Sequence, residues 1–435
     1  MAAPSDLGAP AGARAPGLPW RRMTSFAGLP LISIVGQLTL IPVIASVGGA
    51  TGWAAVGLGQ ALGAGAATVL QYGWGFTGPR LLVPLGDHDR GRLLWLSMLS
   101  RLLVAGLVLP VTAAAAAVLA PDGHRWLAAL TALGAATFGL SAFWYFVGVG
   151  RAGLAARYET VPRLVVLLGA ALVVLLTQDV LWYAVIFLVG QTLIIVWLTA
   201  RLAVVSLSRD TWAAALRALR TQRAAAATDV VVALTQSMPT SIVAWAAPGA
   251  LATFSAGDRI VKLAQSGIQP LFNAFQGWVS EAPGGHMAPR MRLAVAATST
   301  GGLLGGVAFA IGLPPVDRVL FAGEVPVGYD VAVWFGVVLA LYALTSSFNF
   351  NVLAPVGRTG HILRSATTGA VVAILGVAAL AHEFGAVGGA AGVALAQLSI
   401  LAVQVLAWRQ LVRERRAGER RVGPAGDHPL AGGAR

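Results

Sequence analysis

Long apolar segments separated by short polar connections run through almost the whole chain. A helix that crosses a membrane requires about 20 mostly apolar residues, and about twelve segments meet this requirement. These segments are residues 26–48, 53–78, 93–119, 126–149, 160–177, 180–203, 226–247, 250–280, 292–313, 329–353, 363–381 and 386–408. The pattern predicts an all-α polytopic membrane protein with about twelve transmembrane helices.

Arginine is concentrated in every second connection between these segments. The connections on the side of the N-terminus carry Arg80, Arg90, Arg92, Arg151, Arg157, Arg163, Arg201, Arg209, Arg217, Arg220, Arg223, Arg290, Arg292, Arg358 and Arg364. The alternate connections carry only Arg125 and Arg318. Because positively charged connections are retained on the cytoplasmic side, this alternation predicts that both termini are cytoplasmic.

A polar segment divides the apolar segments into two sets of six. It carries Trp212, Leu216 and Leu219 at helical spacing together with several charges, which is typical of an amphipathic helix. We therefore expect two six-helix lobes around a central cavity. The expected organisation is a disordered cytoplasmic tail at 1–25, an N-terminal six-helix lobe at 26–203, an amphipathic inter-lobe linker at 204–225, a C-terminal six-helix lobe at 226–408 and a basic cytoplasmic tail at 409–435.

The composition argues against a soluble enzyme. Of the 435 residues, 57% are hydrophobic and 11% are charged, and the mean hydropathy is +0.76, whereas soluble domains are about a quarter charged. There is no cysteine, and Lys262, the single lysine, does not stand in a phosphate-binding glycine motif. Because the net charge of +13 arises from the arginine-rich connections, nucleic acid is not an expected partner. The histidines show no metal-ligand spacing, and we expect neither a metal nor a cofactor.

The apolar segment 250–280 carries polar residues on one helical face. These residues are Asp258, Lys262, Gln265, Gln269, Asn273, Gln276 and Ser280. Their spacing by three or four positions keeps them together, since successive residues of an α-helix are turned by about 100°. Polar groups facing lipid are costly, so this face must meet protein or water. We interpret it as the wall of a central aqueous cavity; the alternative is that the amides join packed helices by hydrogen bonds.

Other polar residues join this face in the predicted cavity. The candidate substrate-binding residues are Gln37, Gln60, Gln71, Arg101, Arg259, Lys262, Gln265, Gln269, Asn273 and Gln276. Three of them are cations, and charges inside a membrane usually mark transport pathways. Asp229 and Asp258 are the candidate carboxylates for ion coupling, although Asp258 can also neutralise Lys262 four residues away.

Three motifs resemble those of a known transporter family. Residues 57–80 read GLGQALGAGAATVLQYGWGFTGPR, which resembles the tyrosine–glycine–phenylalanine … arginine signature closing the second helix of bacterial polysaccharide flippases. Residues 143–150 read FWYFVGVG, similar to their Trp-x-Phe-x-Gly segment, and residues 254–281 read FSAGDRIVKLAQSGIQPLFNAFQGWVSE, which resembles their eighth helix. The family is the polysaccharide transport (O-antigen or lipid-linked oligosaccharide flippase) branch of the multidrug/oligosaccharidyl-lipid/polysaccharide flippase (MOP) superfamily.

The resemblance implies a secondary-type transporter, a flippase, and not an enzyme. Its substrate would be an oligosaccharide linked to polyprenyl pyrophosphate, exported across the bacterial cytoplasmic (inner) membrane by alternating access. The pyrophosphate would bind cations such as Arg101, Arg259 or Lys262, and an ion gradient or the membrane potential would supply the energy. The expected partners are this lipid-linked oligosaccharide, membrane lipids, and the glycosyltransferases and polymerase of the same pathway.

Three other functions fit parts of the pattern. A multidrug exporter of the same superfamily would share both lobes, but the deep cation Arg101 favours an anionic cargo over a cationic one. A membrane-embedded glycosyltransferase or polymerase of cell-surface polysaccharide would need a catalytic carboxylate or histidine in an outer loop. A lipid II flippase would carry a similar substrate, and the sequence separates it poorly from a polysaccharide flippase.

Overall fold

The computed structural model describes residues 20–280, 287–353 and 359–421, and every regular element in these ranges is helical. The α-helices are α1 (Trp20–Gln71), α2 (Trp74–Leu82), α3 (Asp87–Leu119), α4 (Arg125–Ala136), α5 (Phe143–Val149), α6 (Ala152–Ala155), α7 (Val161–Thr177), α8 (Leu181–Leu202), α9 (Arg209–Ala246), α10 (Leu251–Ser280), α11 (Met287–Leu320), α12 (Tyr329–Phe348) and α13 (Thr359–Arg421). Short turns of other helix types are η1 (Thr137–Leu140), η2 (Ala156–Thr160), η3 (Pro248–Ala250) and η4 (Asn349–Leu353). In the described ranges, 8 helical stretches are long and apolar enough to cross a membrane. The chain is therefore a multi-pass membrane protein.

The longest helices, α1 and α13, each consist of two helices joined at a glycine. A straight helix of 52 residues would be about 78 Å long, against about 30 Å of membrane hydrocarbon. Gly49 has φ 59° and ψ −167°, and residues before and after it line the same cavity, so the chain reverses there. Gly385 has φ 57°, and the close approach of Gly369 to Ile400 marks the same reversal in α13. Glycine adopts this positive φ without the strain that a Cβ would cause.

The polar segment predicted as an amphipathic linker continues into the next predicted span. Ser208 caps α9 by accepting a hydrogen bond from the backbone N–H of Thr211 at 3.3 Å. The helix then continues to Ala246 over 38 residues. Its first turns bury Ala215 and Gln222 against the protein, while Trp212 near the start of the helix is exposed. Linker residues 209–225 therefore form the start of one long helix, and residues 204–208 precede it without helical structure.

The helical regions also extend into both predicted tails. α1 begins at Trp20 and α13 ends at Arg421, whereas the sequence predicted tails at 1–25 and 409–435. Residues 1–19 and 422–435 lie outside the described residues.

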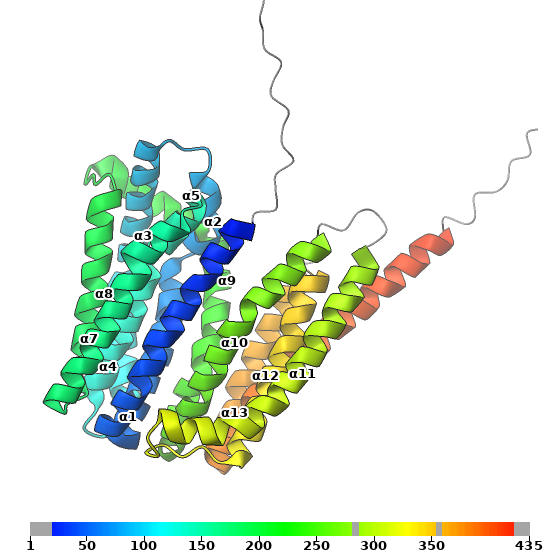
Figure 1. Ribbon diagram of the computed structural model, residues 1–435. Helices are drawn as coiled ribbons and strands as arrows, with labels where there is room; N and C mark the ends of the chain where they lie inside the picture. Colours follow the sequence, from blue (N-terminus) through cyan, green and yellow to red (C-terminus); the bar gives the residue numbers. More distant parts are fainter. Residues whose placement is uncertain (1–19, 281–286, 354–358, 422–435) are drawn as a thin grey trace, which may run out of the picture.

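The helices form two bundles that lie side by side (Figure 1). We call α1–α8 the N lobe and α9–α13 the C lobe. α1 contacts α4 and α7 within the N lobe and α9 and α10 of the C lobe, so it lies at the junction. α9 reaches across as well, since it contacts α1 and α3 in addition to α13.

Small residues allow neighbouring helices to approach closely within each lobe. A Cβ added at Gly63 of α1 would lie 2.4 Å from the carbonyl oxygen of Ala132 in α4. A Cβ added at Gly306 of α11 would lie 2.5 Å from the carbonyl oxygen of Gly336 in α12. Since lipid gives no hydrophobic advantage to helix association, contacts of this kind hold membrane bundles together. Some glycines thus serve close packing, while others, such as Gly49 and Gly385, serve chain reversals.

Candidate functional site

Three cavities follow one another from the N lobe to the C lobe. The N-lobe cavity has a volume of about 300 Å³ and lies among α1, α4, α7 and α8. The middle cavity, of about 120 Å³, lies between α1, α9 and α10. The C-lobe cavity, of about 180 Å³, lies between α9, α10, α12 and α13. Neighbouring cavities share wall residues, so the three cavities are adjacent across the junction of the lobes.

The shared wall residues show that α10 connects the three cavities. Gln60, Ala64 and Arg259 border both the N-lobe and the middle cavity. Asp258 and Lys262 border both the middle and the C-lobe cavity. Adjacent residues on a helix are turned by about 100°, so Asp258 and Arg259 reach cavities on different sides of α10. Gln265, one turn further, also borders the C-lobe cavity.

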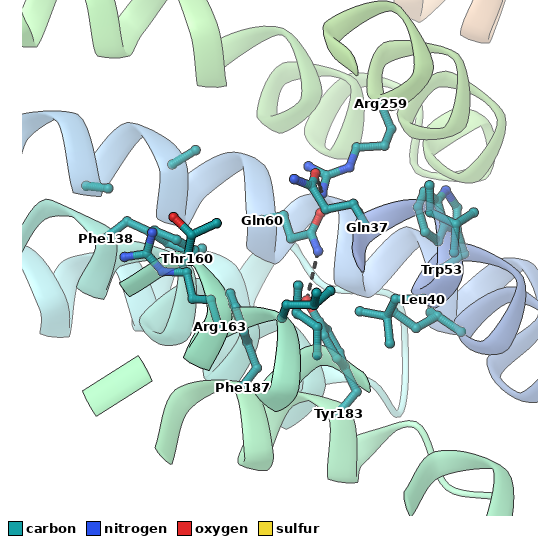
Figure 2. A pocket seen from close by; sticks show the side chains of 17 residues that line it. Gln37, Leu40, Trp53, Gln60, Phe138, Thr160, Arg163, Tyr183, Phe187 and Arg259 are labelled. Atoms are coloured by element: carbon teal, nitrogen blue, oxygen red, sulfur yellow. Dashed lines mark hydrogen bonds between the residues drawn. The ribbon is translucent and has the colours of Figure 1, made fainter. Parts of the chain in front are cut away.

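Arg259 extends from α10 into the N-lobe cavity, where the other wall residues come from the N lobe (Figure 2). Its Nη2 donates a hydrogen bond to Oε1 of Gln37 at 2.5 Å. Nearby, Nε2 of Gln60 donates to the hydroxyl of Tyr183 at 2.8 Å. Nε of Arg259 is buried and has no hydrogen-bond partner among the described residues. The guanidinium therefore retains a donor for a further acceptor.

Arg163 is a second cation in the wall of the N-lobe cavity, and the sequence analysis assigned it to a cytoplasmic connection. It lies at the start of α7, and its guanidinium is 4.1 Å from the centre of the Phe138 ring. Nη2 donates to Oε1 of Glu159 at 2.7 Å, and Nε donates to Oε1 of Gln191 at 2.9 Å. Its position inside the predicted span 160–177 was the signal that would have identified it. Figure 2 shows it well apart from Arg259 within the group of wall residues.

An ion pair lies at the boundary between the middle and C-lobe cavities. Nζ of Lys262 and Oδ2 of Asp258 are 2.6 Å apart, and the hydroxyl of Thr240 donates to the same oxygen at 3.2 Å. Further along the helix, Gln269 accepts a hydrogen bond from the hydroxyl of Tyr342 in α12 at 2.8 Å. On the predicted polar face, Asp258 and Lys262 therefore line cavities, whereas Gln269, further along the helix, forms a hydrogen bond between helices.

Several predicted site residues do not border these three cavities. Arg101 is 1% exposed and donates to the carbonyl oxygens of Gly139 and Ser141 at 3.0 and 2.9 Å. Asp229 accepts a hydrogen bond from the backbone N–H of Gly73 at 2.6 Å, in the turn between α1 and α2. Gln71 is exposed at the end of α1. Arg101 and Asp229 therefore hold backbone groups in this structure.

The last two candidate substrate-binding residues, Asn273 and Gln276, are in the second half of α10. Gln276 is half-buried and does not border any of the three cavities. The side chain of Asn273 lies outside the described residues.

The cavity walls carry more positive than negative charge. Three cations border the cavities, Arg163, Arg259 and Lys262, against one carboxylate, Asp258, which leaves a formal charge of +2 (3 − 1). Glu159 lies behind the wall and pairs with Arg163. The described residues contain no group of three or more histidine, aspartate or glutamate side chains arranged to hold a metal. The arrangement is suited to binding an anion rather than a cation.

Solved structures share this fold over most of the chain. A multidrug resistance MATE family transporter of the MOP superfamily, inward-facing, is 15% identical over 91% of this chain and 99% of that chain, with a TM-score of 0.69. The lipid II flippase MurJ, inward closed, is 10% identical over 88% and 87% respectively, with a TM-score of 0.65. A MOP superfamily transporter from Pyrococcus furiosus Vc1 (DSM3638) is 15% identical over 91% and 96%, with a TM-score of 0.55. No family model and no curated protein matches the sequence.

At this level of identity the likeness concerns the fold. The proteins that share it are membrane transporters and a lipid II flippase. The chain has the fold of MOP-superfamily transporters.

Proposed function

We propose that this protein is a flippase that moves an oligosaccharide linked to polyprenyl pyrophosphate across the bacterial cytoplasmic membrane. The excess of cations over carboxylates in the adjacent cavities at the junction of the lobes is the observation that carries this proposal. A cationic drug would meet an unfavourable charge there, whereas a pyrophosphate would meet compensating guanidinium and ammonium groups. The named substrate of the structural neighbour MurJ, lipid II, is a lipid-linked molecule as well.

Each part of such a substrate has a matching part of the wall. Arg259 can give its buried Nε–H to a phosphate oxygen while it keeps or exchanges its hydrogen bond to Gln37. Lys262 and Gln265 line the C-lobe cavity, where amide and ammonium groups suit sugar hydroxyls. Leu40, Ile44 and other aliphatic residues line the N-lobe cavity and suit the first isoprene units of the lipid.

The transport cycle would be alternating access by rocking of the two lobes around these cavities. In this proposal the chain crosses the membrane about twelve times, because α1 and α13 each supply two crossings and α9 and α10 add two more. In this proposal the arginine-rich connections and both termini lie on the cytoplasmic side, in agreement with the positive-inside rule. A membrane potential or an ion gradient drives export, and Asp258 is the proposed ion-sensing carboxylate of the C lobe. Glycosyltransferases would supply the substrate, and a polymerase would use the exported unit.

Deletion of the gene, followed by analysis of lipid-linked intermediates, tests the proposal. We expect a complete, unpolymerised repeat unit on polyprenyl pyrophosphate to accumulate on the inner leaflet. Loss of that unit would instead indicate a glycosyltransferase. Accumulation of lipid II would indicate a peptidoglycan flippase, and drug sensitivity without any accumulated lipid would indicate a multidrug exporter.

Two matched arginine variants then connect the function to the cavity. Arg259→Gln removes a cation from the cavity wall, so we expect the repeat unit to accumulate as in the deletion strain. Arg125→Gln removes an exposed arginine at the start of α4, and we expect normal export. Equal export by both variants at equal membrane abundance would show that the cavity does not bind the substrate.

A further inference from the structure

Two buried N–H groups of the cavity walls have no acceptor among the described residues. In the part of the chain that the structure describes, ten buried side-chain nitrogen or oxygen atoms lack a hydrogen-bond partner. Two of them belong to residues that border the three cavities, and both are donors: Nε of Arg259 and Nε1 of Trp53. Buried polar groups are nearly always satisfied in folded proteins. These two residues therefore hold the unused donors of the cavity walls.

Trp53 and Arg259 border the same two cavities from opposite lobes. Trp53 belongs to α1 and Arg259 to α10, and both residues border the N-lobe and the middle cavity. In the view of Figure 2, Trp53 lies at the end of the wall opposite Arg163, and the side chain of Arg259 enters between them. Trp53 is 2% exposed, and its ring packs against that of Phe321 with 4.7 Å between the ring centres. The indole is therefore held in place at the boundary between the two cavities.

This boundary offers hydrogen-bond donors and little negative charge. Among the described residues, the wall of the N-lobe cavity contains two arginines and no carboxylate. The carboxylate of the middle cavity is Asp258, whose Oδ2 already accepts from Lys262 at 2.6 Å and from Thr240 at 3.2 Å. An indole N–H and a guanidinium N–H can only donate. A group that satisfies both donors must present acceptor oxygens, and a negatively charged group gains more beside Arg259 than a neutral one does.

We propose that Trp53 is a second phosphate-binding residue, which together with Arg259 holds the pyrophosphate of the lipid-linked substrate at the boundary between the N-lobe and middle cavities. Both N–H groups are buried in this structure, so the anion reaches them when Arg259 exchanges its bond to Gln37 for one to phosphate. The lipid then extends along the aliphatic wall of the N-lobe cavity, and the sugars extend past Lys262. This inference rests on the proposed function and deepens it, since it assigns the phosphate group a position and an uncharged donor.

Binding of a short isoprenyl pyrophosphate tests this role of Trp53. The probe is radiolabelled farnesyl diphosphate, the protein is held in lipid nanodiscs at neutral pH, and empty nanodiscs give the background of partitioning into lipid. Trp53→Phe keeps an aromatic ring and removes the N–H, so we expect about tenfold weaker binding, the value of one hydrogen bond to a charged group. Binding of farnesol, which has the same chain and no phosphate, should not change. A loss confined to the charged probe separates donation to phosphate from packing of the ring.

The matched control is Trp144→Phe. Trp144 is also buried, and its Nε1 also has no hydrogen-bond partner among the described residues, but it borders none of the three cavities. This variant should bind farnesyl diphosphate as the parent protein does. A second arm adds inorganic pyrophosphate as a competitor. We expect it to displace the probe only at far higher concentration than the probe itself, because it lacks the lipid chain.

Four results would overturn the inference. Equal binding of farnesyl diphosphate by Trp53→Phe and the parent, or equal losses in Trp53→Phe and Trp144→Phe, shows that the indole N–H of Trp53 does not hold the phosphate, and leaves the proposed function intact. Displacement by inorganic pyrophosphate at the concentration of the probe assigns the site to free pyrophosphate. Equal binding of farnesyl diphosphate and farnesol by the parent overturns the inference even if Trp53→Phe does not fold, and removes the anion-binding cavity as well. Failure of the proposed function has a separate sign, a deletion strain that accumulates no lipid-linked repeat unit.

Discussion

Replacement of Arg101 by leucine tests whether this buried cation serves the fold or the substrate. The guanidinium donates through Nη1 to the carbonyl oxygens of Gly139 and Ser141, and through Nε to the carbonyl oxygen of Ser97 at 3.1 Å. Gly139 and Ser141 lie where η1 ends before α5. Arg101 therefore fastens α3 to the interruption in the fourth predicted span.

The expected cost follows from the groups that lose their donor. A buried acceptor left unsatisfied costs about 1–3 kcal/mol, so the carbonyl oxygens of Gly139 and Ser141 together cost about 2–6 kcal/mol. Folded domains are stable by only about 5–15 kcal/mol. We therefore expect Arg101→Leu to reduce the amount of folded protein in the membrane strongly.

Size-exclusion chromatography of solubilised membranes, repeated after heating, measures both abundance and heat stability. Arg101→Leu should lower both quantities, whereas Arg259→Gln should leave both unchanged and abolish export, because Arg259 borders two cavities. An Arg101→Leu protein that is as abundant and heat-stable as the parent but fails to export would refute the structural role. In that case Arg101 would belong with the substrate-binding cations.

Two further predictions concern packing and the turn between α1 and α2. Gly63→Ala should lower the melting temperature, because the added Cβ would lie 2.4 Å from the carbonyl oxygen of Ala132. The control Gly301→Ala, whose added Cβ would have no heavy atom within 4 Å, should leave the melting temperature unchanged. Equal melting temperatures for the two variants would contradict the packing argument. Asp229→Ala should lower the melting temperature without abolishing export of the repeat unit, because it removes the acceptor for the backbone N–H of Gly73, while the melting temperature of Asp229→Asn should fall less. Loss of ion-driven export in a fully stable Asp229→Asn protein would instead favour ion coupling.

The positions of the helices could be predicted from the sequence because hydrophobicity is a property of each segment by itself. Most predicted spans coincide with described helices, and Gly49 and Gly385 separate two pairs of them, but span 53–78 crosses the turn between α1 and α2 and span 126–149 crosses the break before α5. The polar face of α10 could be predicted for the same reason, since its spacing of three and four is local helical geometry. Asp258, Lys262 and Gln265 lie in cavity walls as that spacing indicates.

The roles of the buried arginines could not be predicted in this way. Depth within a span suggested Arg101 for the substrate, but its carbonyl partners come from 38 and 40 residues further along the chain. Position near a connection suggested topology for Arg163, but packing of α7 on α8 brings it to Gln191 and to the cavity. Contacts between helices decide which arginine is bound by backbone carbonyl groups and which borders a cavity, and no local sequence pattern contains these contacts.

The two cations of α10 respond differently to a relative movement of the lobes. Lys262 pairs with Asp258 on the same helix at 2.6 Å, so rigid-body rocking moves both together and leaves their distance unchanged. Arg259 instead donates to Gln37 of α1, a contact between the lobes that rocking must lengthen or break. An anion that takes the place of Gln37 would remove this link while keeping the guanidinium satisfied. Substrate binding at Arg259 would thereby lower the cost of separating the lobes, which is the coupling that alternating access requires.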